Sequence, residues 1–97
     1  MKNLGLLATL KAKEGKEIEV ANFIKGAVDL ARREEKTITW YSFKIDPSTF
    51  GIFDTFENEE GREAHLNGTI AATLMEKAPD LLSEEPKIQK IDILSAV

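Results

Sequence analysis

Two side chains in this sequence combine a type and a position that suit proton transfer, His65 and Asp54. His65 is the single histidine, and histidine is the residue whose unperturbed pKa lies near neutrality, so it is the natural proton-transfer group. The alternative is a helical histidine that packs and forms a local hydrogen bond. Asp54 falls within a run of strand character, where an acidic residue is disfavoured and needs a partner or water if it faces inward. The alternative for Asp54 is a structural ion pair with Arg62 or a lysine.

The adjacent rings of Trp40 and Tyr41 supply the next candidates. Neighbouring residues of a strand point to opposite faces of a sheet, so one ring is expected to line a pocket on the helix side and the other the opposite surface. Trp40 is the better packing residue. Tyr41 is the better hydrogen-bonding group, because its hydroxyl needs a partner if it is buried.

Further apolar side chains from several expected elements are candidates for the lining of a pocket. With Trp40, they are Phe23, Phe43, Phe53, Phe56, Leu74 and Met75. Stripes of aromatic residues and methionine form the core in most proteins, so core packing is the alternative for each of them.

A metal site is not expected. The acidic run at 57, 59, 60 and 63 stands at a predicted helix start, where such charges normally form a solvated face, and one histidine adds little to a ligand set. The sequence also lacks a glycine-rich phosphate loop, a Ser-His-Asp order and a dinucleotide fingerprint.

Length and composition restrict the class of protein. A chain of 97 residues with 42% hydrophobic and 31% charged residues is expected to fold as one domain over residues 1–97. The net charge of −4, with the basic residues scattered, makes nucleic acid an unlikely partner. The absence of cysteine excludes disulfides and thiolate sites, and no signal segment or membrane span is evident, so a cytoplasmic location is expected.

The elements that must position these residues follow from the hydrophobic pattern. Residues 4–11 predict a strand, and Gly15 precedes a helix over residues 16–34 whose apolar stripe has helical spacing. Residues 37–45 and 50–57 predict a hairpin around the turn at 46–49. A second helical region begins near Asn58, which can cap it, breaks at Gly68, and ends at Pro79. The tail at 87–97 predicts a final strand.

This β-α-β-β-α-β order indicates an α+β, ferredoxin-like domain, with an antiparallel four-stranded sheet and both helical regions on one face. Several strands carry apolar residues on both faces, for example Leu6 and Leu7 in the first strand. Two helices cover one face only, so the second face needs a ligand or another copy of the sheet. We therefore expect a homodimer through sheet-face packing.

With these elements in place, the chain resembles the antibiotic biosynthesis monooxygenase family of dimeric α/β-barrel proteins over nearly its whole length. The most specific stretch is DTFENEEGREAHL, in which Asp54 and Phe56 stand where members show an acidic and an aromatic residue, and Ala64-His65-Leu66 matches an Ala-His-Leu signature. Gly15 and the Trp40-Tyr41 pair support it.

The resemblance implies a monooxygenase of small aromatic, quinol or anthrone-like substrates that uses molecular oxygen without metal, flavin or other cofactor. It implies catalytic roles for His65 and Tyr41 in handling protons and for Asp54 in orienting them. The heme-degrading branch of the family carries an asparagine and a tryptophan where this sequence has Ala8 and His65. Heme degradation by that arrangement is therefore not expected.

Two other functions fit the same sequence. One is a non-catalytic dimer that binds a small apolar metabolite in the same pocket. The other is a relative in fold alone, with side chains filling the space between sheet and helices, because shared architecture does not carry function.

Overall fold

Four strands form one antiparallel sheet in the computed structural model, which describes residues 3–97. They are β1 (Leu4–Lys11), β2 (Thr37–Asp46), β3 (Thr49–Phe56) and β4 (Lys87–Asp92), and their order in the sheet is β2-β3-β1-β4. The predicted strands and hairpin are confirmed, except that the last strand ends at Asp92 and residues 93–97 lie outside it. The hairpin turn is held by Asp46, whose Oδ1 accepts a hydrogen bond from the backbone N–H of Ser48 at 3.0 Å.

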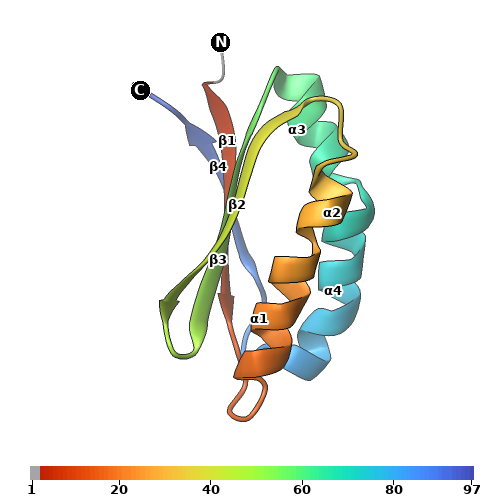
Figure 1. Ribbon diagram of the computed structural model, residues 1–97, viewed down its shortest axis with the longest axis vertical. Helices are drawn as coiled ribbons and strands as arrows, with labels where there is room; N and C mark the ends of the chain where they lie inside the picture. The colour runs from red at the N-terminus through yellow and green to blue at the C-terminus, as the bar shows by residue number, and fades with distance from the viewer. Residues whose placement is uncertain (1–2) are drawn as a thin grey trace.

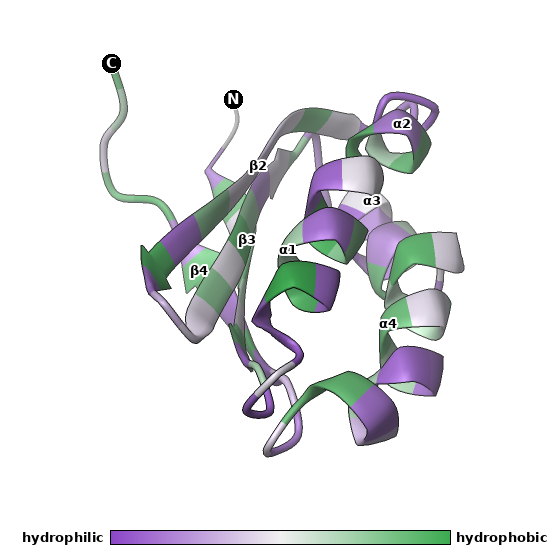
Figure 2. Ribbon diagram, turned by 60° about the horizontal axis from the view of Figure 1, so that its bottom comes forward, coloured by the Kyte–Doolittle hydropathy of each residue, from purple (hydrophilic) through white to green (hydrophobic). Residues whose placement is uncertain are grey.

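The helices cover a single face of this sheet (Figure 1, Figure 2). In chain order they are α1 (Glu17–Gly26), α2 (Val28–Ala31), α3 (Glu59–Leu66) and α4 (Thr69–Leu81). The order and layering confirm the ferredoxin-like α+β prediction. Within residues 3–97, every helix falls short of the length and apolar character that crossing a bilayer demands.

The predicted helix over residues 16–34 is wrong in its extent. It is divided at Ala27 into α1 and the short α2, which ends at Ala31. Gly26 is exposed and weakens the helix there, and beyond it the backbone tightens. Leu30 N–H donates to Ala27 O, and Glu34 N–H to Ala31 O, both three residues apart as in a 3₁₀ turn. This tighter path brings Glu34 to the start of β2.

The prediction that the second helical region ends at Pro79 is also wrong, since α4 continues to Leu81. Proline lies here in the last turn, where the missing N–H removes only one of the final helical bonds. The loop after β1 satisfies the end of the helix, because the Lys13 backbone N–H donates to Leu81 O at 2.8 Å and the Lys13 ammonium donates to Pro79 O. Burial of Leu81 in the core holds the last turn in place.

The core lies between the sheet and the helices. Residues at alternate positions of β1 and β3 face the helices, among them Leu6, Leu10, Phe50, Ile52 and Phe56, all of them buried. Leu10, Phe50 and Ile52 pack with Val20, Ile24 and Leu74 from the helices, and Ile70 forms a second buried cluster with Ala27 and Ala31.

The opposite face of the sheet carries its own apolar group and is not covered by any helix of the described chain (Figure 1). The strand registers place Leu7, Tyr41, Phe43, Phe53 and Ile91 on it. Two glycines make this face flat, since a Cβ at Gly51 would lie 2.5 Å or less from the Phe43 ring and one at Gly5 would lie 3.2 Å from the Phe53 ring. We call this surface the open face, and its composition confirms the expectation that both sheet faces are apolar.

Candidate active site

The position of His65 follows from a close approach at the start of α3. Asn58 caps the helix as predicted, its Oδ1 accepting from the Gly61 backbone N–H at 2.8 Å. Gly61 then lies against Lys36, so closely that a Cβ there would be 2.7 Å from the Lys36 Cβ. Residues four apart share a helix face, so His65 points in the same direction one turn later and meets Glu34.

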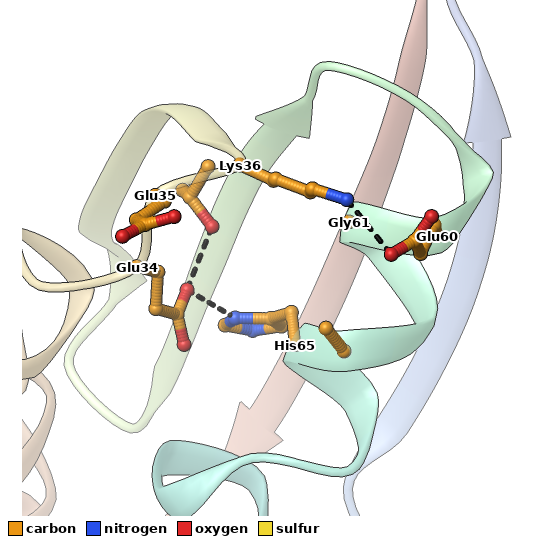
Figure 3. A pocket seen from close by; sticks show the side chains of 8 residues that line it. Glu34, Glu35, Lys36, Glu60, Gly61 and His65 are labelled. Atoms are coloured by element: carbon orange, nitrogen blue, oxygen red, sulfur yellow. Dashed lines mark hydrogen bonds and ion pairs between the residues drawn. The ribbon is translucent and has the colours of Figure 1, made fainter.

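Both imidazole nitrogens of His65 contact carboxylates. Nδ1 lies 2.8 Å from Glu34 Oε1 (Figure 3), and Nε2 lies 3.0 Å from Asp54 Oδ2. The ring also packs on Phe56, with ring centroids 5.3 Å apart and planes tilted by 47°. His65 is 9% exposed, so these contacts form away from bulk water.

Asp54 is a buried carboxyl on a central strand, only 1% exposed, and it faces the helices between Leu6 on β1 and Trp40 on β2. Its contact with His65 Nε2 is short but lacks hydrogen-bond alignment. Among the described residues, Asp54 Oδ2 is therefore buried without a hydrogen-bond partner, and so is Nε1 of Trp40, the residue paired with Asp54 on β2. Such atoms are costly, and they mark a place where a ligand or water group can bind.

Burial raises the pKa of Asp54 from 3.8 to about 6. The positive charge of His65 opposes this rise, and the negative charge of Glu34 adds to it. A carboxyl that titrates near neutrality can take up and release a proton under physiological conditions, which suits a general base.

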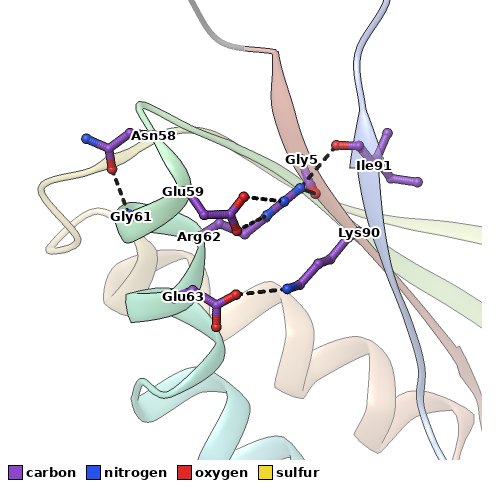
Figure 4. A network of polar contacts seen from close by, with 8 residues as sticks. All are labelled: Gly5, Asn58, Glu59, Gly61, Arg62, Glu63, Lys90 and Ile91. Carbon is purple, nitrogen blue, oxygen red and sulfur yellow. Dashed lines mark hydrogen bonds and ion pairs between the residues drawn. The ribbon is translucent and has the colours of Figure 1, made fainter.

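The alternative partner for Asp54, Arg62, is engaged elsewhere. Its guanidinium is bidentate to Glu59, at 3.1 and 2.7 Å, and donates to the carbonyl oxygens of Gly5 and Ile91 (Figure 4). These bonds fasten α3 to β1 and β4, so Arg62 supports the site by fixing the helix that carries His65.

A small apolar cavity adjoins Asp54 and His65 between the sheet and α4. It has a volume of about 30 Å³ and is lined by Leu6, Ala8, Ile52, Asp54, His65, Leu66, Ile70, Ala71, Leu74 and Ile88. We call it the inner cavity. Ile88 belongs to the edge strand β4 and is 41% exposed, so the cavity lies close to the molecular surface there.

A second, larger hollow lies on the other side of His65 (Figure 3). This outer pocket has a volume of about 300 Å³ and is lined by Glu34, Glu35, Lys36, Thr37, Glu60, Gly61, Ala64 and His65. His65 is the residue that lines both spaces.

The structure brings together some of the predicted site residues. His65 and Asp54 meet, Leu74 lines the inner cavity, Phe56 packs under His65, and Trp40 lies beside Asp54. Trp40 also contacts the buried core.

The other predicted lining residues lie elsewhere. Tyr41, Phe43 and Phe53 are on the open face, because their strand positions differ by an odd number of residues from those of Trp40 and Asp54. Within one chain, Tyr41 therefore shares no cavity with His65 and Asp54. Phe23 lines a separate surface hollow near the end of α4, and Met75 is 53% exposed beside Pro86.

Sequence reasoning missed Glu34, the closest partner of His65. Thirty-one residues separate the two, and an acidic residue at the end of a predicted helix gives no signal of a distant contact. It also missed Ala71 and Ile88, whose part in the inner cavity depends on how α4 lies against β4.

Among residues 3–97, no group of three or more histidine, cysteine or acidic side chains has an arrangement that could hold a metal ion. Both His65 nitrogens face carboxylates, and the remaining lining of the inner cavity is apolar. The chemistry available to the chain itself is thus proton transfer beside an apolar surface.

Solved structures show what the chain is similar to. A protein of unknown function from Nitrosomonas europaea is 48% identical, with a TM-score of 0.97 over 100% of this chain and 94% of that one. Two proteins named as putative antibiotic biosynthesis monooxygenases have TM-scores of 0.83 and 0.85. The first, from Nitrosomonas europaea, is 15% identical over 95% of this chain and 99% of that one. The second, from Deinococcus radiodurans, is 16% identical over 97% and 95%.

No family model matches the sequence, and no curated protein matches it. The structural similarity to the two proteins at 15% and 16% identity establishes the fold. The 48% sequence identity over the full length of this chain establishes membership of one family. The chain therefore belongs to the same family as the Nitrosomonas europaea protein of unknown function, and its fold is that of the antibiotic biosynthesis monooxygenases.

Proposed function

We propose that this protein is a cofactor-independent monooxygenase of quinol or anthrone-like substrates, acting as a cytoplasmic homodimer. An anthrone-type ring carries a CH₂ group that becomes acidic beside the aromatic system. Loss of one proton gives an anion that donates electrons to dioxygen. The peroxide formed on that carbon is protonated and loses water as the second hydrogen leaves, so CH₂ and O₂ become C=O and H₂O.

The observation that carries this proposal is the Asp54 carboxyl, which is 1% exposed at the wall of an apolar cavity and 3.0 Å from His65. Asp54, with a pKa of about 6, is the base that accepts the first proton. His65 is the neighbouring group that protonates the peroxide. The apolar lining orients the ring and keeps water from the anion.

The size of the inner cavity limits where the substrate can lie. About 30 Å³ holds a water or a dioxygen molecule, and ligand sites for ring compounds usually exceed roughly 300 Å³. The ring would therefore lie at the cavity mouth, against Ala71 and Ile88, with the reacting carbon directed at Asp54. An adjacent hollow at Met75, Ala78 and Pro86, of about 320 Å³, provides room along α4.

A non-catalytic binding function is the second candidate, and the outer pocket favours it. Its volume of about 300 Å³ already accommodates a small ligand without movement of side chains. Six of its eight lining residues are polar or charged, however, which suits a charged metabolite better than an electron-rich ring.

The open face supports the dimer. Tyr41 is 59% exposed on this face, which also carries the rings of Phe43 and Phe53 over Gly51 and Gly5. A second copy of the same sheet is a surface of matching shape and polarity. In this arrangement Tyr41, Phe43 and Phe53 belong to the interface between the two chains.

Oxygen consumption is the direct test. Purified protein in the presence of a metal chelator should consume oxygen with saturable dependence on a hydroquinone or anthrone, and it should form one quinone per oxygen molecule for the anthrones. A panel of such compounds that stabilises the protein against heat while no oxygen is consumed would instead support the binding function.

Replacing one alanine of each pocket by phenylalanine distinguishes the two pockets. Ala71→Phe fills the mouth of the inner cavity, and we expect it to lower kcat/KM about 10- to 100-fold, since misplacing a substrate slightly has costs of this size. Ala64→Phe is the matched control, because Ala64 lies on α3 and lines the outer pocket. A loss of activity in Ala64→Phe with none in Ala71→Phe would move the substrate site to the outer pocket.

A further inference from the structure

His65 separates two spaces of different character. The inner cavity is small and apolar, and the outer pocket is ten times larger. Charged side chains, among them Glu34, Lys36 and Glu60, line the outer pocket (Figure 3). Through Nε2 the imidazole faces Asp54 in the inner cavity, and through Nδ1 it faces Glu34 in the outer pocket. One aromatic ring therefore connects a secluded carboxyl with a carboxylate near solvent.

Exposure increases steadily along this line of three groups. The side chain of Asp54 is 2% exposed, that of His65 is 10%, and that of Glu34 is 23%. Both joining contacts, at 3.0 and 2.8 Å, have lengths over which protons pass between heavy atoms. The contact between Nε2 and Asp54 lacks hydrogen-bond alignment in this structure and must align when a proton passes.

Glu34 is held in place for its contact with His65. Its Oε1 accepts a hydrogen bond from the Thr37 hydroxyl at 2.7 Å as well as from the imidazole. An ionised carboxylate only accepts hydrogen bonds, so Nδ1 carries the donated proton in this arrangement. Once Asp54 has taken up a proton, a neutral ring presents the Nε2 lone pair to that proton.

We propose that Glu34 is the outer member of a proton relay, Asp54 to His65 to Glu34, that exchanges protons between the inner cavity and the outer pocket. The use of this relay in catalysis rests on the proposed function, whereas the path itself rests on the geometry of the three side chains. Asp54 passes a proton to Nε2, Nδ1 passes its own to Glu34, and Glu34 releases one to water. Each step forms one O–H or N–H bond as another breaks, so one proton enters and one leaves.

Other charged groups near His65 are paired with each other. Lys36 lies 2.8 Å from Glu60 across the outer pocket, and this hydrogen bond raises the pKa of Lys36 and lowers that of Glu60. The remaining charges around α3 form the pairs Arg62 with Glu59 and Glu63 with Lys90, and Glu35 lines the outer pocket. Of these groups, Glu34 is the one that contacts Nδ1.

Such a relay serves a reaction that requires a dry site. A substrate at the mouth of the inner cavity would block the short route from Asp54 to solvent. The proton taken by Asp54 can then leave on the far side of His65, and the same path returns a proton to His65 for the peroxide, without water reaching the substrate anion.

Glu34→Gln tests the relay, and Glu60→Gln is its control. The glutamine side chain still accepts hydrogen bonds from His65 and Thr37, so the fold should persist, but it cannot accept a proton. Glu60 is a carboxylate of the same pocket that pairs with Lys36 instead. In Glu34→Gln, we expect kcat to fall roughly 100-fold with KM unchanged. Glu60→Gln should behave like the unsubstituted protein.

Chemical rescue excludes a structural role for Glu34. In Glu34→Ala, formate or acetate can enter the outer pocket and take the place of the missing carboxylate. We expect either anion to restore at least about a tenth of kcat, and chloride at equal ionic strength to restore nothing. A Glu34→Ala protein that is folded, inactive and insensitive to formate would overturn the relay.

A second readout needs no turnover, so it separates the relay from the proposed function. His65 is the single histidine, and its imidazole nitrogens therefore give unambiguous NMR signals in ¹⁵N-labelled protein. Exchange of the Nδ1 proton with water should slow at least about tenfold in Glu34→Gln and be unaffected in Glu60→Gln. Equal exchange rates in both variants would refute the relay even if the protein is an oxygenase.

Discussion

Asp54→Asn is expected to remove oxygenase turnover and, at the same time, to stabilise the protein above about pH 6. Asparagine has nearly the same shape but cannot act as a base, so we expect kcat to fall roughly 100- to 10,000-fold. The gain in stability follows from the burial that raises the pKa of the carboxyl to about 6, against the opposing charge of His65.

The direction of this pH dependence follows from the pKa of Asp54 in the folded and the unfolded chain. The pKa of Asp54 is about 6 in the folded protein and near 3.8 when unfolded, so folding favours the protonated form. This contribution to stability is fully present below pH 3.8 and is lost as the pH rises through 6. A rise of about two pKa units corresponds to about 3 kcal/mol in the free energy of unfolding, as an order of magnitude.

Denaturant unfolding between pH 4 and pH 8 measures the effect. The variant should match the unsubstituted protein within about 1 kcal/mol near pH 4 and exceed it by up to about 3 kcal/mol at pH 8. Asp80 is an exposed carboxylate of α4, so Asp80→Asn serves as the control. Its difference in stability from the unsubstituted protein should not grow between pH 4 and pH 8. If Asp54→Asn were less stable at pH 8, the burial cost would be outweighed by its attraction to His65, and the assignment of Asp54 as a base titrating near neutrality would be wrong.

A residue that lowers stability at working pH calls for a functional reason. An apolar residue at position 54 would pack between Leu6 and Trp40 without any charge to desolvate. Groups of this kind concentrate at sites of chemistry, where stability is sacrificed for reactivity. The joint change in turnover and stability is therefore a sharper test than either alone.

The fold could be predicted from sequence because its signals are local. The apolar run of β1, the β-branched and aromatic run of β2, the turn residues at 46–49 and the Asn58 cap each act over a few residues, and each is confirmed. The errors fell where tertiary contacts overrode a local rule. Lys13, more than sixty residues away, satisfies the helix end around Pro79 and lets α4 continue.

The candidate site could be predicted only in part, for the same reason. His65 and Asp54 are unusual in their own segments, so sequence alone singled them out. The alternation of side chains along a strand could show that Trp40 and Tyr41 point to opposite faces. It could not show which face the helices cover, and so it could not show that Trp40 lies on the same face as Asp54. Glu34 carried no signal, because its role comes from the packing of α3 at Gly61.

Phe53→Glu is expected to convert a dimer of the unsubstituted protein into monomers. Phe53 lies on the central strand β3 opposite Leu7, in the middle of the open face. In a two-fold interface one substitution introduces two carboxylates, each costing several kcal/mol to bury without a partner. We expect the dissociation constant to rise at least about 1,000-fold, which corresponds to about 4 kcal/mol.

Light scattering at low micromolar concentration is the measurement. The unsubstituted protein should give about twice the 10.8 kDa chain mass, and Phe53→Glu should give a single chain. Because Phe53 packs on Gly5, Tyr41→Glu is a second variant, whose ring is 59% exposed and contributes less to the fold of one chain. Ile18→Glu is the control, since Ile18 is a 77% exposed residue of α1 on the helical side and should leave the mass unchanged.

The turnover of these monomers would decide what the open face does for the reaction. The inner cavity is bounded by residues of one chain, so a monomer that stays folded should retain His65, Asp54 and their contacts. Activity equal to that of the dimer would exclude Tyr41, Phe43 and Phe53 from the site and leave them to assembly alone. Lost activity in a folded monomer would mean that sheet pairing supports the cavity, through the strands that carry Asp54 and Leu6. A monomeric unsubstituted protein would contradict the dimer itself, and the apolar open face would then require another partner.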